Sequence, residues 1–138
     1  MIIADTGFFL ALANVRDRDH AAAKRSLADL VEPLVTTWPV MTETCHLMAN
    51  RLNAEAAETF VASAARGAFQ LFELGPAHLP RILELMRKYH QLPMDLADAS
   101  LMILAEHLGS GRILSTDRRD FGAYRWKNRR PFHNLMID

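Results

Sequence analysis

The chain begins with the stretch MIIADTG at residues 1–7, which decides its fold class. An apolar run broken by Asp-Thr-Gly is typical of a short buried strand that ends at Ala4. The apolar residues 8–15 that follow predict a buried helix. A buried strand that passes directly into a helix is the start of an α/β unit, in which parallel strands are covered by helices.

The same alternation continues along the chain and predicts one domain over residues 1–138. Asn53 is expected to cap one helix, and Gly109 to end another. We therefore expect an α/β fold with a mostly parallel central sheet flanked by helices. Beyond residue 15, the predicted helices cover 20–30, 38 onward, 54–65, 76–89 and 95–108, and the predicted strands cover 34–37, 69–74, 112–115 and 135–137.

Composition sets the broad class of the protein. The 138 residues are 50% hydrophobic and 23% charged, which is ordinary for a soluble globular domain. The single cysteine, Cys45, excludes an internal disulfide and fits a reducing compartment. Because no run is long and apolar enough to span a membrane, we expect a cytoplasmic protein without membrane association.

Charge is balanced over the whole chain but not along it. The formal net charge is zero, so the total does not indicate nucleic-acid binding. The C-terminal part nevertheless predicts a local basic face, which could contact phosphates or could be a solvated surface. Its basic residues are Arg112, Arg118, Arg119, Arg125, Lys127, Arg129 and Arg130, and the acidic residues there are Asp117, Asp120 and Asp138.

Four acidic residues are the candidate site. Asp5 and Asp117 follow strand-like runs, and ligands of open α/β sheets bind outside the carboxyl ends of the strands. Glu43 and Asp98 lie on helix faces with apolar neighbours, where a lone carboxylate is costly. Carboxylate oxygens are ligands that suit Mg²⁺ or Mn²⁺. The set predicts a metal site for phosphodiester chemistry.

Each of these residues also has a purely structural interpretation. Asp5 and Asp117 could cap helices or shape turns, and Glu43 could favour a helix N-terminus through the helix dipole. Asp98 could pair with an arginine, but among the four it is the hardest to explain without a metal. Asp95, one turn earlier, has an evident capping role and is an auxiliary candidate.

Other catalytic motifs are missing from the sequence. Neither a phosphate-binding loop nor a GxSxG elbow is found, and the six histidines lack the spacing of a zinc protease. Cys45 and His46 have no second Cys/His pair for structural zinc. Asp120 more simply shapes its loop or pairs with Arg118 or Arg119.

The ordered set of acidic segments resembles the PIN-domain ribonucleases, and specifically the VapC-type toxins of bacterial toxin–antitoxin pairs. The segments are MIIADTG (1–7), Thr42-Glu43, ADASL (97–101) and LSTDRRDF (114–121). The resemblance implies that Asp5, Glu43, Asp98 and Asp117 hold Mg²⁺ or Mn²⁺, with Thr116 in support. It also implies RNA cleavage, a VapB-type antitoxin as partner and a homodimer.

One departure from the family pattern lies in the first motif. Gly7 stands where a serine is more usual, which removes a hydroxyl from the predicted site. Two further interpretations stay open at this point. A small-molecule phosphohydrolase could use an aspartate at a strand end, although Gly7 occupies the place of the second aspartate that a dehalogenase-like enzyme would carry. The other is an inactive PIN-like binding module.

Overall fold

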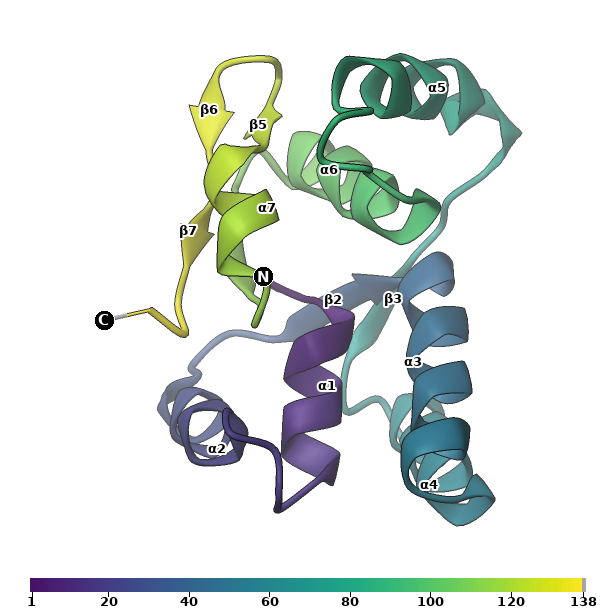
Figure 1. Cartoon of the computed structure of the whole chain (residues 1–138), viewed down its shortest axis with the longest axis vertical. Helices are drawn as coiled ribbons and strands as arrows, with labels where there is room; N and C mark the ends of the chain where they lie inside the picture. The colour runs from purple at the N-terminus through teal and green to yellow at the C-terminus, as the bar shows by residue number, and fades with distance from the viewer. Residues whose placement is uncertain (138) are drawn as a thin grey trace.

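A computed structural model describes residues 1–137 of the chain, and its architecture confirms the predicted α/β class. Five strands form a parallel sheet in the order β3-β2-β1-β4-β7, and a separate antiparallel hairpin pairs β5 with β6 (Figure 1). The strands are β1 (Ile2–Ala4), β2 (Leu34–Thr37), β3 (Gln70–Phe72), β4 (Arg112–Leu114), β5 (Arg125–Trp126), β6 (Arg130–Pro131) and β7 (His133–Asn134).

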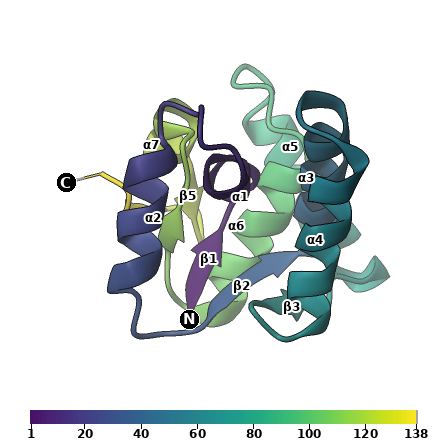
Figure 2. The same ribbon diagram turned by 90° about the horizontal axis from the view of Figure 1, so that it is seen from below.

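Helices cover both sides of the sheet. In Figure 1, α5 and α6 lie above it and α1, α2 and α4 lie below it; Figure 2 shows the same layers from below. The helices are α1 (Thr6–Ala13), α2 (His20–Asp29), α3 (Trp38–Arg51), α4 (Ala54–Ala65), the 3₁₀ turn η1 (Pro76–His78), α5 (Leu79–Lys88), α6 (Leu96–Leu108) and α7 (Arg118–Ala123).

Burial follows from this layering. β1 and β2 are buried along their whole length because helices cover both faces, which explains why they lack polar alternation. Helix α6 is buried on most of its circumference, from Ala99 to Ala105, and packs on β1, β2, α3 and α5. None of the helices within residues 1–137 combines the length and the apolar character that crossing a bilayer requires.

Strand order places the predicted site. β1 is the first strand in the chain, and it lies between β2 on one side and β4 on the other. The chain connections therefore diverge between β1 and β4, which is where open parallel sheets bind ligands at their carboxyl edge. Asp5 directly follows β1, and Asp117 lies three residues beyond Leu114, the last residue of β4.

The C-terminal segment differs from the prediction. Helix α7 and the β5–β6 hairpin were not expected, and the last strand is His133–Asn134 rather than 135–137. Helix α7 is too short for apolar periodicity to reveal it. The hairpin turn contains Lys127 (φ 50°) and Asn128 (φ 61°) in the left-handed region, so the usual glycine signal is missing.

The predicted ends of two other helices are confirmed. Asn53 accepts a hydrogen bond from Ala56 N at 2.8 Å, so it caps α4 as expected. Gly109 ends α6 with a left-handed φ of 67°, a conformation that glycine adopts without the strain that a Cβ causes.

Candidate metal centre

One open cavity of about 340 Å³ brings all four predicted carboxylates together. Asp5 comes from the end of β1, Glu43 from α3, Asp98 from α6, and Asp117 from the N-terminus of α7. Four segments that are far apart in the sequence thus meet at the carboxyl edge of the sheet. The other lining residues are Thr6, Gly7, Leu10, Leu47, Leu92, Pro93, Asp95, Thr116, Arg119 and Asp120.

Asp5 is the most rigidly held of the four. Its Oδ1 accepts a hydrogen bond from Thr6 N at 2.7 Å, and its Oδ2 accepts one from Ser115 Oγ at 2.8 Å. Only 8% of Asp5 is exposed. Burial raises its pKa to about 6 against the effect of these hydrogen bonds, and the carboxylates of Glu43 and Asp117 raise it further. Asp5 therefore caps α1 and also faces the cavity.

Asp98 lies in the first turn of α6 and forms a capping box with Asp95. Asp98 N donates to Asp95 Oδ1 at 2.8 Å, and Asp95 N donates to Asp98 Oδ2 at 3.5 Å. Burial raises the pKa of Asp98 to about 8, and the negative charges of Asp95 and Asp5 add to this effect. Within residues 1–137, no arginine forms an ion pair with Asp98, so the simple structural interpretation does not explain it.

Glu43 and Asp117 are less deeply placed. Glu43 is half-buried on α3; burial and the charge of Asp95 raise its pKa, and Arg51 opposes the shift. Asp117 Oδ1 accepts a hydrogen bond from Asp120 N at 2.9 Å, which makes Asp117 the cap of α7. Burial raises the pKa of Asp117 as well. Raised pKa values at all four positions mean that the folded protein disfavours their negative charges.

Ser115 links two of the carboxylates and was not singled out from the sequence. Its hydroxyl donates to Asp5 Oδ2 and accepts a hydrogen bond from Asp117 N at 3.0 Å. Ser115 directly follows β4 and is fully buried. The available signal was its place two residues before Asp117, where a serine hydroxyl commonly bonds the backbone of a turn.

Tyr124 is a second residue that sequence reasoning missed. Its hydroxyl donates to Asp98 Oδ2 at 3.1 Å, although 26 residues separate the two in the chain. The tyrosine is fully buried, and burial together with the charge of Asp98 raises its pKa. The phenol therefore stays protonated at neutral pH and holds one oxygen of Asp98 in place. No local sequence pattern predicts a contact between residues so far apart in the chain.

Gly7 is required by the close approach of Thr116. A Cβ at position 7 would lie 1.9 Å from Thr116 Oγ1 and 3.1 Å from Thr116 Cβ. The threonine side chain therefore occupies the space that a serine at position 7 would need. The missing hydroxyl of the first motif is matched by a threonine hydroxyl that lines the same cavity.

Of the seven predicted basic residues, all within residues 1–137, Arg119 alone is among those that line the carboxylate cavity. Arg119 lines the cavity and pairs with Asp120, with Nε 3.2 Å from Oδ1. Arg112 instead forms a two-pronged ion pair with Glu32, in which Nη2 lies 2.8 Å from Oε1. Arg112 belongs to the predicted basic face, but it begins β4, whereas the cavity lies beyond the other end of that strand, so Arg112 does not line the cavity.

The donor chemistry of the cavity fits a hard divalent cation. Carboxylates that repel one another and carry raised pKa values are the groups that such an ion neutralises. Within residues 1–137, however, no three His, Cys, Asp or Glu side chains are already close enough to enclose an ion. The structure thus supplies a shared cavity and the ligand type, without a closed ligand cage.

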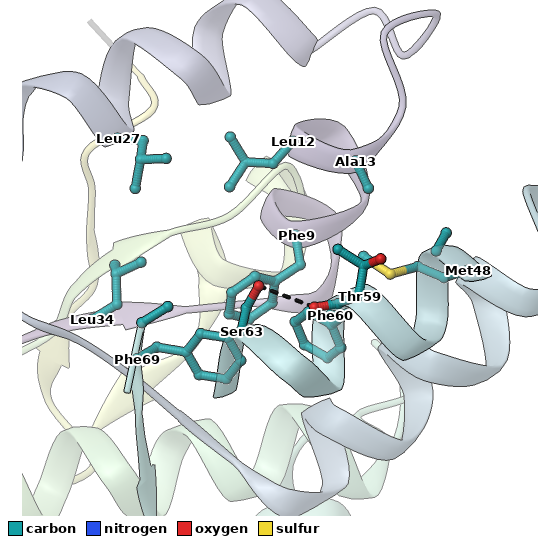
Figure 3. Close-up of a pocket in the computed structure, with 12 residues that line it drawn as sticks. Phe9, Leu12, Ala13, Leu27, Leu34, Met48, Thr59, Phe60, Ser63 and Phe69 are labelled. Carbon is teal, nitrogen blue, oxygen red and sulfur yellow. Dashed lines mark hydrogen bonds between the residues drawn. The ribbon is translucent and has the colours of Figure 1, made fainter. Parts of the chain in front are cut away.

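A second hollow is lined in part by α1 residues and is apolar (Figure 3). The rings of Phe9, Phe60 and Phe69 gather on one of its walls, with Phe9 4.9 Å from each of the other two rings. Leu12 and Leu27 face them from α1 and α2. Among residues 1–137, no acid, base or thiol lines this hollow of about 270 Å³, so the residues that line it offer no ligands for a metal ion.

Comparison with known proteins assigns the chain to a protein family. The PIN domain family matches residues 2–127, and the chain belongs to this family. Among curated proteins, it is 31% identical to Ribonuclease VapC26 of Mycobacterium tuberculosis over 124 residues, which cover 90% of this chain and 92% of the relative. The resemblance inferred from the acidic segments is therefore confirmed.

A solved structure supports the fold independently. The crystal structure of Mycobacterium tuberculosis VapC20, described as a sarcin-ricin-loop-cleaving toxin, superposes with a TM-score of 0.80. The match covers 86% of this chain and 92% of VapC20 at 22% sequence identity. At that identity the likeness establishes the PIN fold alone.

Proposed function

We propose that the protein is a metal-dependent endoribonuclease and the toxin of a type II toxin–antitoxin pair. The observation that carries the proposal is the meeting of Asp5, Glu43, Asp98 and Asp117 in one cavity at the carboxyl edge of the sheet. Membership of the PIN family and the similarity to Ribonuclease VapC26 support the reaction class. A small-molecule phosphohydrolase has less support, because Gly7 stands where its second aspartate would be.

Mg²⁺ or Mn²⁺ is the proposed cofactor, with Asp5 and Asp98 as the first choices for direct ligands and Glu43 and Asp117 completing the set. When bound, such a cation offsets the charge of the scissile phosphate and makes water a better nucleophile at neutral pH. Two ions are compatible with four carboxylates, as in other phosphodiester-cleaving sites.

The residues of this chain prepare the site by holding carboxylates in place. Ser115 Oγ and Thr6 N fix both oxygens of Asp5, and Tyr124 fixes one oxygen of Asp98. In the absence of a cation, Asp98, with a pKa of about 8, holds a proton at neutral pH. Asp98 would have to release that proton to hold a cation, so metal affinity should rise with pH.

RNA must bring phosphates to an acidic cavity, so positive charge has to offset the repulsion. Arg119 lines the cavity and is the nearest candidate for a phosphate contact, and Arg118 is exposed beside it. Such contacts position the backbone and do not read its sequence. A VapB-type antitoxin that blocks the cavity, and a homodimer, are the proposed protein partners.

Cleavage of RNA by the purified protein tests the reaction. Structured RNA is incubated with Mg²⁺ or Mn²⁺, with and without EDTA, and the new ends are sequenced. We expect cleavage that EDTA abolishes and that Asp98→Asn lowers by at least about 100-fold, the scale at which removal of an electrostatic group acts. Asp29→Asn, an exposed aspartate on α2, is the matched control and should cleave normally.

Two results would contradict the proposal: cleavage that survives EDTA, or cleavage that survives Asp98→Asn. Sequencing of RNA ends after induced expression in cells extends the test to the target. Co-purification with the product of a neighbouring small reading frame examines the antitoxin, and light scattering after size exclusion measures the proposed homodimer.

A further inference from the structure

Trp38 is exposed beside the carboxylate cavity. It is the first residue of α3 and 57% exposed, whereas the other tryptophan, Trp126, is 5% exposed. An open hollow of about 620 Å³ extends from its side chain, and its surface is mostly apolar. The hollow is lined by Trp38, Pro39, Thr42, Glu43, His46, Asp95, Leu96 and Ala97.

This hollow lies next to the candidate metal centre and shares two lining residues with it. Glu43 and Asp95 line both cavities, so a molecule that occupies one reaches the wall of the other. Leu96, which follows Asp95, is 47% exposed and forms part of the apolar surface. A large apolar surface is thus presented to solvent at the edge of a proposed phosphodiester-cleaving site.

The backbone beneath Trp38 is held firmly. Thr37 caps α3, with its Oγ1 3.5 Å from Val40 N, and the same hydroxyl lies 2.6 Å from Ser100 Oγ in the core. Thr42 Oγ1 donates to Trp38 O at 3.1 Å. The exposed indole is therefore attached to a helix start whose backbone is fixed by hydrogen bonds. Because the backbone is already fixed, binding of a ligand has to order only the torsions of the Trp38 side chain.

The charges around the hollow select which part of a nucleotide fits. Among residues 1–137, no arginine or lysine lines this mostly apolar hollow to hold a phosphate, whereas Arg119 lines the carboxylate cavity, so the hollow suits a neutral, flat group rather than the backbone. A nucleobase has those properties, and bases that are not paired stack on exposed aromatic side chains. Bases inside a duplex are already stacked on one another and do not present a free face.

We propose that Trp38, with Leu96 beside it, is a stacking platform for an unpaired base next to the scissile phosphodiester. The inference rests on the proposed ribonuclease function and deepens it, because it names the residue that holds a base of the substrate. Trp38 is a binding residue in this proposal and takes no part in bond cleavage.

The test uses a single-stranded RNA that contains a mapped cleavage site, with an abasic nucleotide placed in turn at each neighbouring position. In the wild type, one position should be sensitive, with KM rising roughly tenfold when its base is removed. Trp38→Ala should raise KM by a similar factor on the intact RNA and should lose sensitivity at that position. Trp38→Phe keeps an aromatic ring and should therefore keep a KM near that of the wild type and most of the sensitivity to the missing base. Leu79→Ala changes another exposed apolar residue and should behave as the wild type.

Binding is measured separately from activity. In an Asp98→Asn background that does not cleave, the RNA should quench tryptophan fluorescence, and Trp38→Phe should remove the quenching because Trp126 is buried. Thermal unfolding checks that the variants fold. If the wild type cleaves no RNA, the proposed function fails, and the fluorescence titration still decides on the platform.

Two outcomes would overturn the stacking platform itself. One is RNA cleavage by Trp38→Ala with unchanged KM and an unchanged response to abasic positions. The other is a change from dimer to monomer in Trp38→Ala, which would assign this surface to contact between two copies of the chain.

Discussion

At the scale of single residues, hydroxyl groups decide how the carboxylates are presented. Ser115 and Tyr124 each donate to one carboxylate, at 2.8 Å to Asp5 and 3.1 Å to Asp98. Both donors are fully buried, so neither hydrogen bond competes with bulk water. These bonds oppose the effect of burial, which otherwise raises the pKa of both acids.

Gly7 and Thr116 provide a prediction at this scale. Gly7→Ala places a Cβ against Thr116 Oγ1, and we expect it to destabilise the protein by about 1–3 kcal/mol, as overpacking does. The double variant Gly7→Ala with Thr116→Ala removes the closest contact and should recover part of that loss. Denaturant unfolding of the wild type, the two single variants and the double variant measures the coupling free energy between positions 7 and 116. Purely additive losses of stability would show that the two side chains do not compete for space.

At the scale of secondary-structure elements, the C-terminal part depends on tertiary packing. The β5–β6 hairpin consists of two short strands, too few to be stable alone. It is held by Trp126, which is buried and whose Nε1 donates to Pro131 O at 3.1 Å. Tyr124, immediately before β5, carries the contact to Asp98. The hairpin thus helps to position a residue of the site.

Gly111→Ala tests this dependence. A Cβ at position 111 would lie 2.3 Å from Trp126 Nε1 and 3.1 Å from the backbone oxygen of Pro131, so the hairpin would have to shift. We expect a loss of about 1–3 kcal/mol in the free energy of unfolding, together with reduced ribonuclease activity through Tyr124. Unfolding and cleavage assays measure the two effects, and stability equal to the wild type would argue against this packing.

At the scale of the whole molecule, the carboxylates link stability to pH. Asp5 and Asp98 have pKa values of about 6 and 8, both above the ordinary 3.8. The folded protein therefore binds more protons than the unfolded chain over this range, and its stability falls as pH rises from about 4 to 8. Glu32 and Glu106 have lowered pKa values and act in the opposite direction, at lower pH.

We predict that the metal-free protein loses roughly 2 kcal/mol of stability between pH 5 and pH 8, with the contribution of the partly exposed Asp98 reduced by solvent screening. Mg²⁺ or Mn²⁺ should restore stability at pH 8, because the ion binds the folded state. Asp98→Asn should weaken both the pH dependence and the response to metal, and Asp29→Asn should change neither. Denaturant unfolding at several pH values with EDTA or metal measures this; a stability that rises over the same range would refute it.

Much of the fold could be predicted because its causes are local. Apolar runs at residues 2–4 and 34–37 mark strands buried on both faces, and capping residues such as Asn53 and Gly109 mark helix ends. Helix α7 and the hairpin were missed, because their short elements depend on contacts with distant residues more than on their own sequence.

The candidate site could likewise be predicted from the sequence only in part. The sequence alone determined the α/β alternation and the four acidic residues, because strand ends and apolar helix faces leave a recognisable local pattern around Asp5, Glu43, Asp98 and Asp117. Only the tertiary structure decided which hydroxyls hold them, why position 7 is glycine, and that Trp38 stands exposed beside them. The physical reason is that such contacts join residues up to 110 positions apart, as Ser115 and Asp5 are, and are set by packing around the sheet.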